Sequence, residues 1–171
     1  MKMRAGLVLG ALCSCLACLS PPSAARRAPT HSGADALPAI SATERAMMDA
    51  TNRERAAEHL SPLRADARLV RAAQLQARQM ARFGVMAHDV PRAEYPTFAS
   101  RLEYARYPYR DAAENVARGY GTGTSVITGW MNSPHHRANM LAPDFTQVGT
   151  GFATDGAGER YYAEVFGRPV R

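Results

Sequence analysis

The period of the hydrophobic pattern changes along this 171-residue chain, and the change limits the folds open to it. Over the first two thirds, apolar residues recur at helical spacing, most clearly over 66–83. After Pro143 they alternate with small or polar residues over 148–153 and 161–167, and the turn sequence DGAG separates the two runs. Helical segments followed by a strand pair predict one α+β domain, with helices packed on a mainly antiparallel sheet.

The amino terminus has the pattern of an export signal. Lys2 and Arg4 flank the start of an apolar run that is too short to span a membrane as a stop-transfer helix, and small residues follow it. These features predict a signal peptide at 1–25 and a secreted or periplasmic protein. The next residues, 26–40, are rich in Pro, Ala, Ser and Thr, which predicts a flexible spacer before a folded domain at 41–171.

All three cysteines, Cys13, Cys15 and Cys18, lie inside the predicted signal. Cleavage near Ala25 leaves a mature domain without disulfides, so the fold must depend on its hydrophobic core. The alternative is a lipoprotein anchored through a retained signal-region cysteine. We favour soluble secretion, because neither candidate lipidation sequence is a good match.

The charge pattern argues against nucleic-acid binding. Removal of Lys2 and Arg4 from the 21 basic residues leaves 19 against 15 acidic ones, so the net charge falls from +6 to +4. The excess is spread along the chain in alternation with Asp and Glu, without a basic block or interleaved aromatic residues. We therefore expect no nucleic-acid partner.

Several segments carry helix start and stop signals. Asp66 can cap the amphipathic helix, and Gly84 stops it. In the first helix, Asn52 and Arg55 are three residues apart and share a face, which we expect to be solvated or locally bonded. The first predicted helix is capped by Thr43 or Ser41 and runs to about residue 59. The other predicted helices span 66–83, 97–107 and 125–131, with a further one beginning at Pro134.

A short stretch over 129–141 combines a helix start with two adjacent histidines. Ser133 can accept hydrogen bonds from amides of the first turn, and Pro134 lacks an amide that would be unpaired there. His135 and His136 then lie in the opening turn. The positive end of the helix disfavours an imidazolium, so a histidine there is more easily kept neutral.

Two other polar positions lie outside that stretch. His88 follows the stop of the amphipathic helix by four residues and is expected in a loop. Glu114, followed by Asn115, lies among small apolar residues, so its carboxyl needs a partner or must be protonated. One of the many arginines is the expected partner.

Taken in chain order, His88, Glu114 with Asn115, and the segments 130–141 and 148–151 resemble the CAP superfamily of cysteine-rich secretory, antigen 5 and pathogenesis-related proteins. The bacterial SCP-like branch is the most similar. The resemblance covers nearly all of the predicted mature chain. Further agreement lies at 52–55 and 162–167.

The resemblance implies an α-β-α sandwich, with a central antiparallel sheet between helical layers and a cleft of histidine and acidic residues. His88, Glu114 and His136 match the cleft positions. His135 replaces the usual glycine, so either adjacent histidine could face the cleft; we prefer His136. Ser133 stands where many eukaryotic members have an acidic residue. The supporting positions are Asn115, Ser133, His135 and Asn139.

Two neutral imidazoles, His88 and His136, with the Glu114 carboxylate would suit zinc and leave room for water or a ligand. Zinc is thus a candidate ligand, although no cofactor is required. Open coordination is chemically capable of hydrolysis with Glu114 as base. The chain has neither an HExxH helix nor a nucleophile placed by a motif. Glu164 is predicted on the side of Tyr162 and is an additional candidate polar group.

Three functions follow from these observations. The first is a secreted binding module, for a small molecule, a lipid, a divalent metal, or an envelope or host protein. The second is a metal-dependent hydrolase or peptidase that uses His88, Glu114 and His136. The third is a structural envelope protein in which the same cluster only stabilises loops. We favour the binding module over an enzyme.

Overall fold

The computed structural model of the chain describes residues 36–170. The predicted signal peptide at 1–25 and the first part of the predicted spacer lie outside the described residues. The elements are α1 (Ala42–Ala57), β1 (Arg64–Ala65), α2 (Ala67–Phe83), α3 (Phe98–Tyr104), β2 (Tyr109–Arg118), α4 (Gly123–Met131), α5 (Pro134–Leu141), β3 (Gln147–Thr154) and β4 (Arg160–Pro169).

Within the described part of the chain, four strands form one sheet in the order β1-β3-β4-β2. The predicted hairpin is present, since β3 and β4 pair antiparallel, and β2 pairs antiparallel with the other side of β4. The short β1 adds a parallel edge beside β3. The sheet is therefore mainly antiparallel, as predicted, and its outer strands are β1 and β2.

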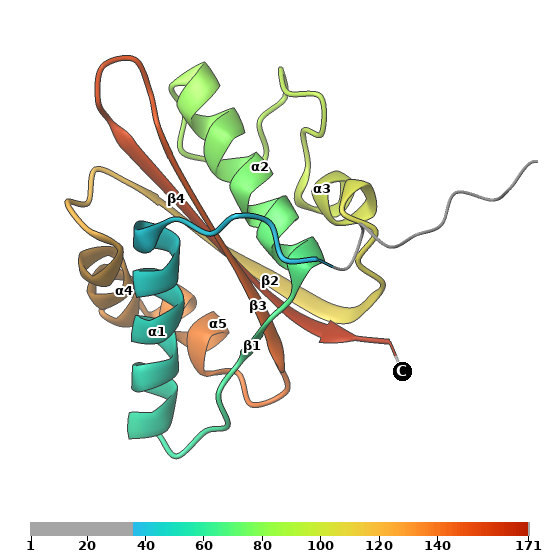
Figure 1. Cartoon of the computed structure of the whole chain (residues 1–171), viewed down its shortest axis with the longest axis vertical. Helices are drawn as coiled ribbons and strands as arrows, with labels where there is room; N and C mark the ends of the chain where they lie inside the picture. Colours follow the sequence, from blue (N-terminus) through green and yellow to red (C-terminus); the bar gives the residue numbers. More distant parts are fainter. Residues whose placement is uncertain (1–35, 171) are drawn as a thin grey trace, which may run out of the picture. The chain divides into compact units, whose positions relative to one another are not determined.

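Helices cover both faces of this sheet. Figure 1 shows α1, α4 and α5 on one side and α2 with α3 on the other. Alternation along β4 sends Tyr161 and Val165 into the core beneath α2, and Tyr162 and Phe166 into the core beneath α1. The predicted α-β-α sandwich is confirmed.

Helix α2 forms where its caps and its apolar face predict it. The Asp66 side chain accepts from the amides of Arg68 and Leu69, and Gly84 ends the helix in the left-handed conformation at φ 64°. The helix lies directly on β3, because a Cβ at Gly149 would overlap the backbone of Leu69. This close contact fixes the position of α2 on the sheet.

The polar pair Asn52 and Arg55 of helix α1 lies in a different environment from the one predicted. Asn52 and Arg55 do not form a solvated face: Asn52 bonds both the amide and the carbonyl of Leu63, and Arg55 is 1% exposed. The Arg55 guanidinium donates to the carbonyls of Met140 and Ala142, while its Nε donates to the carbonyl of Ser61. Buried carbonyl groups that need donors explain why a cation is retained there.

Other boundaries also differ from the prediction. Neither β1 nor β2 is predicted as a strand by the local sequence pattern. Helix α3 ends at Tyr104 rather than near residue 107, because Arg106 adopts a positive φ of 56° that no continuing helix allows. Strand β2 then places Glu114 and Asn115 at the edge of the sheet.

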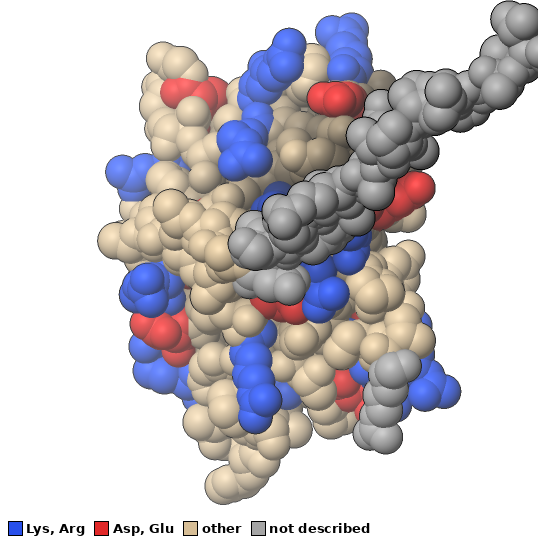
Figure 2. Space-filling model, turned by 45° about the vertical axis from the view of Figure 1, so that its right-hand side comes forward, with Lys and Arg blue, Asp and Glu red and all other residues tan. Residues whose placement is uncertain are grey.

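The surface carries charges of both signs. On the face shown in Figure 2, basic and acidic side chains are interspersed over the described residues. None of the helices found among residues 36–170 is long and apolar enough to cross a membrane.

Candidate functional site

Glu114 lies on the edge strand β2 and turns its carboxyl group inward. Strand alternation directs it to the face covered by α2 and α3, where its side chain is 2% exposed. Arg101 of α3, itself 0% exposed, places Nη2 at 3.0 Å from Oε1 and 3.1 Å from Oε2. The expected arginine partner is therefore Arg101, and the buried carboxylate is paired.

His88 is held from two directions. Its carbonyl accepts from Arg101 Nη2 at 2.7 Å and from Gln76 Nε2 at 3.1 Å, and its ring Nδ1 lies 3.0 Å from Glu114 Oε1. A carboxylate only accepts, so Nδ1 carries the proton and the neutral ring presents the Nε2 lone pair. The hydrogen bond to Glu114 raises the pKa of His88, and partial burial opposes that rise.

His136 lies in the first turn of α5 and is half-buried, whereas His135 is exposed. Its Nδ1 is 2.9 Å from Ser133 Oγ, and its ring centroid is 6.2 Å from that of Trp130. Burial lowers the pKa of His136, and the neighbouring charges of His88 and His135 lower it further. This imidazole is therefore neutral at pH 7.

The predicted cap of α5 needs correction. Ser133 does occupy the N-cap position and Pro134 the first turn, but the Ser133 side chain makes no capping hydrogen bond. Its hydroxyl is bonded to the His136 ring instead. In this structure the hydroxyl orients the histidine and does not cap the helix.

Asn115 connects β2 to the other helical layer. It points away from Glu114, as strand alternation requires, and its Nδ2 donates to the carbonyl of His136 at 3.1 Å. Its Oδ1 accepts from Asn139 Nδ2 at 2.8 Å. The two histidines thus approach the edge strand from opposite layers, His88 through Glu114 and His136 through Asn115.

Glu164 does not join this cluster. It lies on the central strand β4, on the side of Tyr162 as expected, but its carboxyl is fully buried beneath α1. Thr51 Oγ1 donates to Oε1 at 2.8 Å, and Oε2 has no partner among the described residues. Burial raises the pKa of Glu164 to about 8, although the hydrogen bond from Thr51 acts in the opposite direction.

The donor set at the edge of the sheet is consequently limited. In the part of the chain that the structure describes, no three His, Cys, Asp or Glu side chains are arranged to hold a metal ion. What is available is two imidazoles, each with its Nδ1 bonded to a protein oxygen.

Comparison with known proteins identifies the family. Residues 48–166 match the model of the cysteine-rich secretory protein family, CAP. The chain belongs to the CAP family. The matched range contains His88, Glu114 and His136, so the candidate site lies inside the CAP domain.

Bacterial proteins are among the similar ones. The Bacillus subtilis (strain 168) protein YkwD is 32% identical over 131 residues, a match that covers 75% of this chain and 49% of YkwD. An extracellular SCP-domain protein from Bacillus anthracis has a crystal structure with a TM-score of 0.67 and 28% identity, covering 74% of this chain and 40% of that one. The chain thus spans less than half the length of either relative.

A third similar structure is nearly the same size. An outer surface protein from Borrelia burgdorferi has a TM-score of 0.69 over 80% of this chain and 99% of its own, at 17% identity. At that identity the likeness concerns the CAP fold. These structural relatives are therefore extracellular or outer-surface proteins.

Sequence reasoning missed two residues of this CAP site, Arg101 and Gln76. Both lie on helix faces that also carry apolar residues: Arg101 is three residues after Phe98 and four before Ala105, and Gln76 is in the buried stripe of α2. A polar residue inside an apolar stripe was the available signal, because such a residue is buried only when it has a partner.

Proposed function

We propose that this CAP domain is an exported binding module whose two histidines, His88 and His136, hold a divalent transition-metal ion. The observation that supports this most directly is that both Nδ1 atoms are bonded to protein oxygens, at Glu114 and Ser133. Such bonds orient an imidazole and leave its Nε2 for a metal. Imidazole nitrogen suits zinc, copper or nickel rather than magnesium or calcium.

Two protein ligands leave the remaining coordination positions to water or to an incoming group. A site of this kind binds a metal less tightly than a closed structural site, and it can share the ion with a small ligand or with a side chain of another protein. The proposal therefore deepens the binding-module hypothesis and does not require a cofactor for folding.

The hydrolase alternative has less support. A general base must reach the water that it deprotonates. Both oxygens of Glu114 lie against Arg101, and the side chain is 2% exposed. Glu114 is better placed to orient His88 than to accept a proton from bound water.

The structural alternative has a specific observation in its favour. Arg101 and Gln76 hold the carbonyl of His88, so the network stabilises the loop after α2 whether or not the ring binds anything. Removal of the ring alone should then leave the fold nearly unchanged. Binding and loop stabilisation are separable by experiment for that reason.

The test is zinc titration of the exported chain by calorimetry, with His88→Gln, His136→Gln and His135→Gln compared with the wild type. His135 is the matched control, because it precedes His136 in the same turn but is exposed. We expect binding in the wild type and in H135Q, and an affinity weaker by roughly tenfold or more in H88Q and H136Q. Equal affinity in all four proteins, or no binding by the wild type, would refute the proposal.

Export is part of the same proposal and has its own test. The extracellular and outer-surface relatives support it, together with the pattern at 1–25. Mass spectrometry of the protein recovered from its native compartment should give a mature chain that begins near Arg26. A lipid-modified amino-terminal cysteine would identify the anchored form instead.

A further inference from the structure

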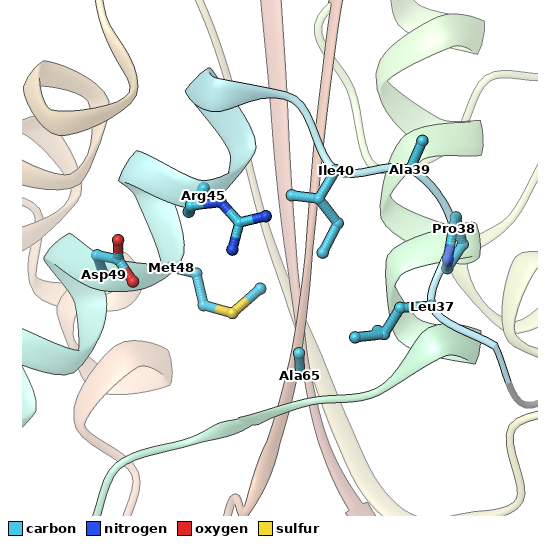
Figure 3. Close-up of a pocket in the computed structure, with 8 residues that line it drawn as sticks. All are labelled: Leu37, Pro38, Ala39, Ile40, Arg45, Met48, Asp49 and Ala65. Carbon is cyan, nitrogen blue, oxygen red and sulfur yellow. The ribbon is translucent and has the colours of Figure 1, made fainter.

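A cavity lies away from the histidine site. It has a volume of about 350 Å³, is open to solvent on one side, and is lined by the segment that precedes α1, by α1 itself and by β1. None of His88, Glu114 and His136 lines it. Figure 3 shows the side chains of Ile40, Met48 and the other lining residues around this space.

The segment 37–40 forms one wall of the cavity and is fixed at its carboxyl end. Gln74 of α2 donates to the carbonyl of Ala39 at 2.9 Å. Ser41 then begins α1 through a capping box with Glu44, in which the Glu44 amide donates to Ser41 Oγ at 3.2 Å and the Ser41 amide donates to Glu44 Oε2 at 2.6 Å. The segment therefore bridges from α2 to α1 above β1.

The lining is divided into an apolar end and a charged end. Leu37 and Ala65 lie at one end in Figure 3, with Ile40 and Met48 in the middle. Arg45 and Asp49 of α1 lie at the other end, and the Arg45 guanidinium extends toward the space between Ile40 and Met48. A ligand that fits must be apolar at one end and charged at the other.

The two charged groups are one helical turn apart and carry opposite charges. Residues at this spacing are neighbours on a helix surface and commonly pair. Within residues 36–170, however, neither side chain forms a hydrogen bond or an ion pair with another described residue. Both charges are therefore available to a ligand, a carboxylate at Arg45 and an ammonium at Asp49.

From this arrangement we infer that the cavity binds a free amino acid with a large apolar side chain. The zwitterionic end satisfies Arg45 and Asp49 together, and the side chain fills the apolar end. The guanidinium fork matches a carboxylate geometrically. A volume of about 350 Å³ lies at the lower end of the range for small-molecule sites, roughly 300–1,000 Å³, which suits a ligand of the size of phenylalanine.

A simple fatty or aromatic carboxylate fits less well. It would satisfy Arg45 but leave Asp49 facing a second negative charge. An amine of the same size would satisfy Asp49 but place a second positive charge beside Arg45. The cavity should therefore prefer the zwitterion to either singly charged analogue.

The experiment measures binding of three probes to the full chain by NMR and calorimetry: L-phenylalanine, phenylpropionate and phenethylamine. For a ligand of about a dozen heavy atoms we expect a dissociation constant on the order of 1 mM for L-phenylalanine. Each analogue, which lacks one charge, should bind about fivefold more weakly. Equal affinity for the three probes, or no binding of L-phenylalanine, would overturn the inference.

Substitutions test whether Arg45 contacts the carboxylate of the ligand and Asp49 its ammonium group. Arg45→Gln should weaken L-phenylalanine about fivefold but should not weaken phenethylamine, whose ammonium Arg45 repels. Asp49→Asn should weaken L-phenylalanine but should not weaken phenylpropionate, whose carboxylate Asp49 repels. Arg53→Gln is the control, because Arg53 is an exposed arginine of α1 that does not line the cavity. If R45Q and D49N bind as R53Q does, the inference fails.

A cavity-filling variant supplies a second, independent readout. Ala65→Leu enlarges the side chain at the apolar end and should abolish binding of L-phenylalanine, with thermal melting used to verify the fold. Binding that persists in the folded A65L protein would contradict the assignment. His88→Gln should bind L-phenylalanine normally, since this cavity is independent of the histidine site.

Discussion

Two buried glutamates on neighbouring strands show two ways of placing a carboxyl group inside one domain. Glu114 on β2 pairs in register with Val165, the residue after Glu164 on β4, so the two carboxyl groups start from adjacent positions and enter opposite faces of the sheet. Glu114 is bonded to Arg101 and His88. Glu164 receives a hydrogen bond from Thr51 alone among the described residues.

The difference follows from what each face can supply. On the α2 and α3 face, Arg101 brings a cationic donor and His88 a ring N–H to the edge strand, and an ionised carboxylate is tolerated there. Beneath α1, a hydroxyl is what reaches Glu164, and the protonated form is favoured up to about pH 8. One site therefore depends on a charge pair, and the other on the absence of charge.

The largest expected effect comes from removing the cation of the first site. Arg101→Met leaves Glu114 buried without its guanidinium and also releases the carbonyls of His88 and Pro96. We expect the free energy of unfolding to fall by about 3–5 kcal/mol, measured by urea denaturation.

A double variant separates the charge from the packing. Arg101→Met combined with Glu114→Gln removes the uncompensated charge, so it should recover part of the lost stability. If the double variant is less stable than R101M alone, the ion pair is not what makes the arginine necessary.

An intermediate effect on stability is expected when Glu164 is replaced by a residue that cannot ionise. Glu164 has a folded-state pKa raised from 4.5 to about 8. Its stabilising contribution is therefore complete below pH 4.5 and is lost as the pH rises to about 8, because the unfolded chain ionises first. Glu164→Gln cannot ionise and should be more stable than the wild type at pH 7, by on the order of 3 kcal/mol.

The measurement is thermal and urea unfolding of both proteins from about pH 4 to about pH 9, a range that brackets the two pKa values. The difference between wild type and E164Q isolates Glu164, because the other titrating groups are common to both. The two stability curves should converge at the acid end and separate as the pH rises. Parallel curves over the whole range would show that Glu164 is ionised in the folded domain.

The smallest effect is expected at the exposed end of the first site. His88 has a pKa above 6.5, raised by Glu114, so its charged form stabilises the fold below pH 6.5 and this contribution disappears as the pH rises through the folded-state pKa. Its side chain is 56% exposed, so solvent screens the pair. His88→Gln should cost less than about 1 kcal/mol near pH 5.5 and almost nothing near pH 9, as measured by thermal melting. A larger loss of stability in H88Q near pH 9 than near pH 5.5 would show that the charged form of His88 does not stabilise the fold.

Much of the fold could be predicted from local signals. Caps and stops such as Asp66 and Gly84 act within one turn, and alternation near the end of the chain identified the hairpin. Strand β2 was missed because its burial depends on the partners it meets across β4. The two-residue β1 is held by pairing with β3 and not by any pattern of its own.

In the candidate site, too, some residues could be predicted from the sequence and others depend on packing in the folded domain. The positions of His88, Glu114 and His136 came from motif order, which is a property of the sequence. The place of Arg101 inside an apolar stripe indicates that it is buried with a partner, but the identity of that partner as Glu114 depends on how α3 packs against β2. The bond between Ser133 and His136 depends on the side-chain rotamers of both residues in the folded domain, which the sequence pattern of a helix start does not specify.

The buried guanidinium of Arg55 has a consequence for the loops around it. It holds carbonyls from the turn after α1 and from the turn after α5, so two connections far apart in sequence end on one side chain. Surface loops ordinarily accept insertions. An added residue in either of these turns would pull a carbonyl off a cation that is shielded from solvent, so they should be the connections of this domain that least tolerate a change of length.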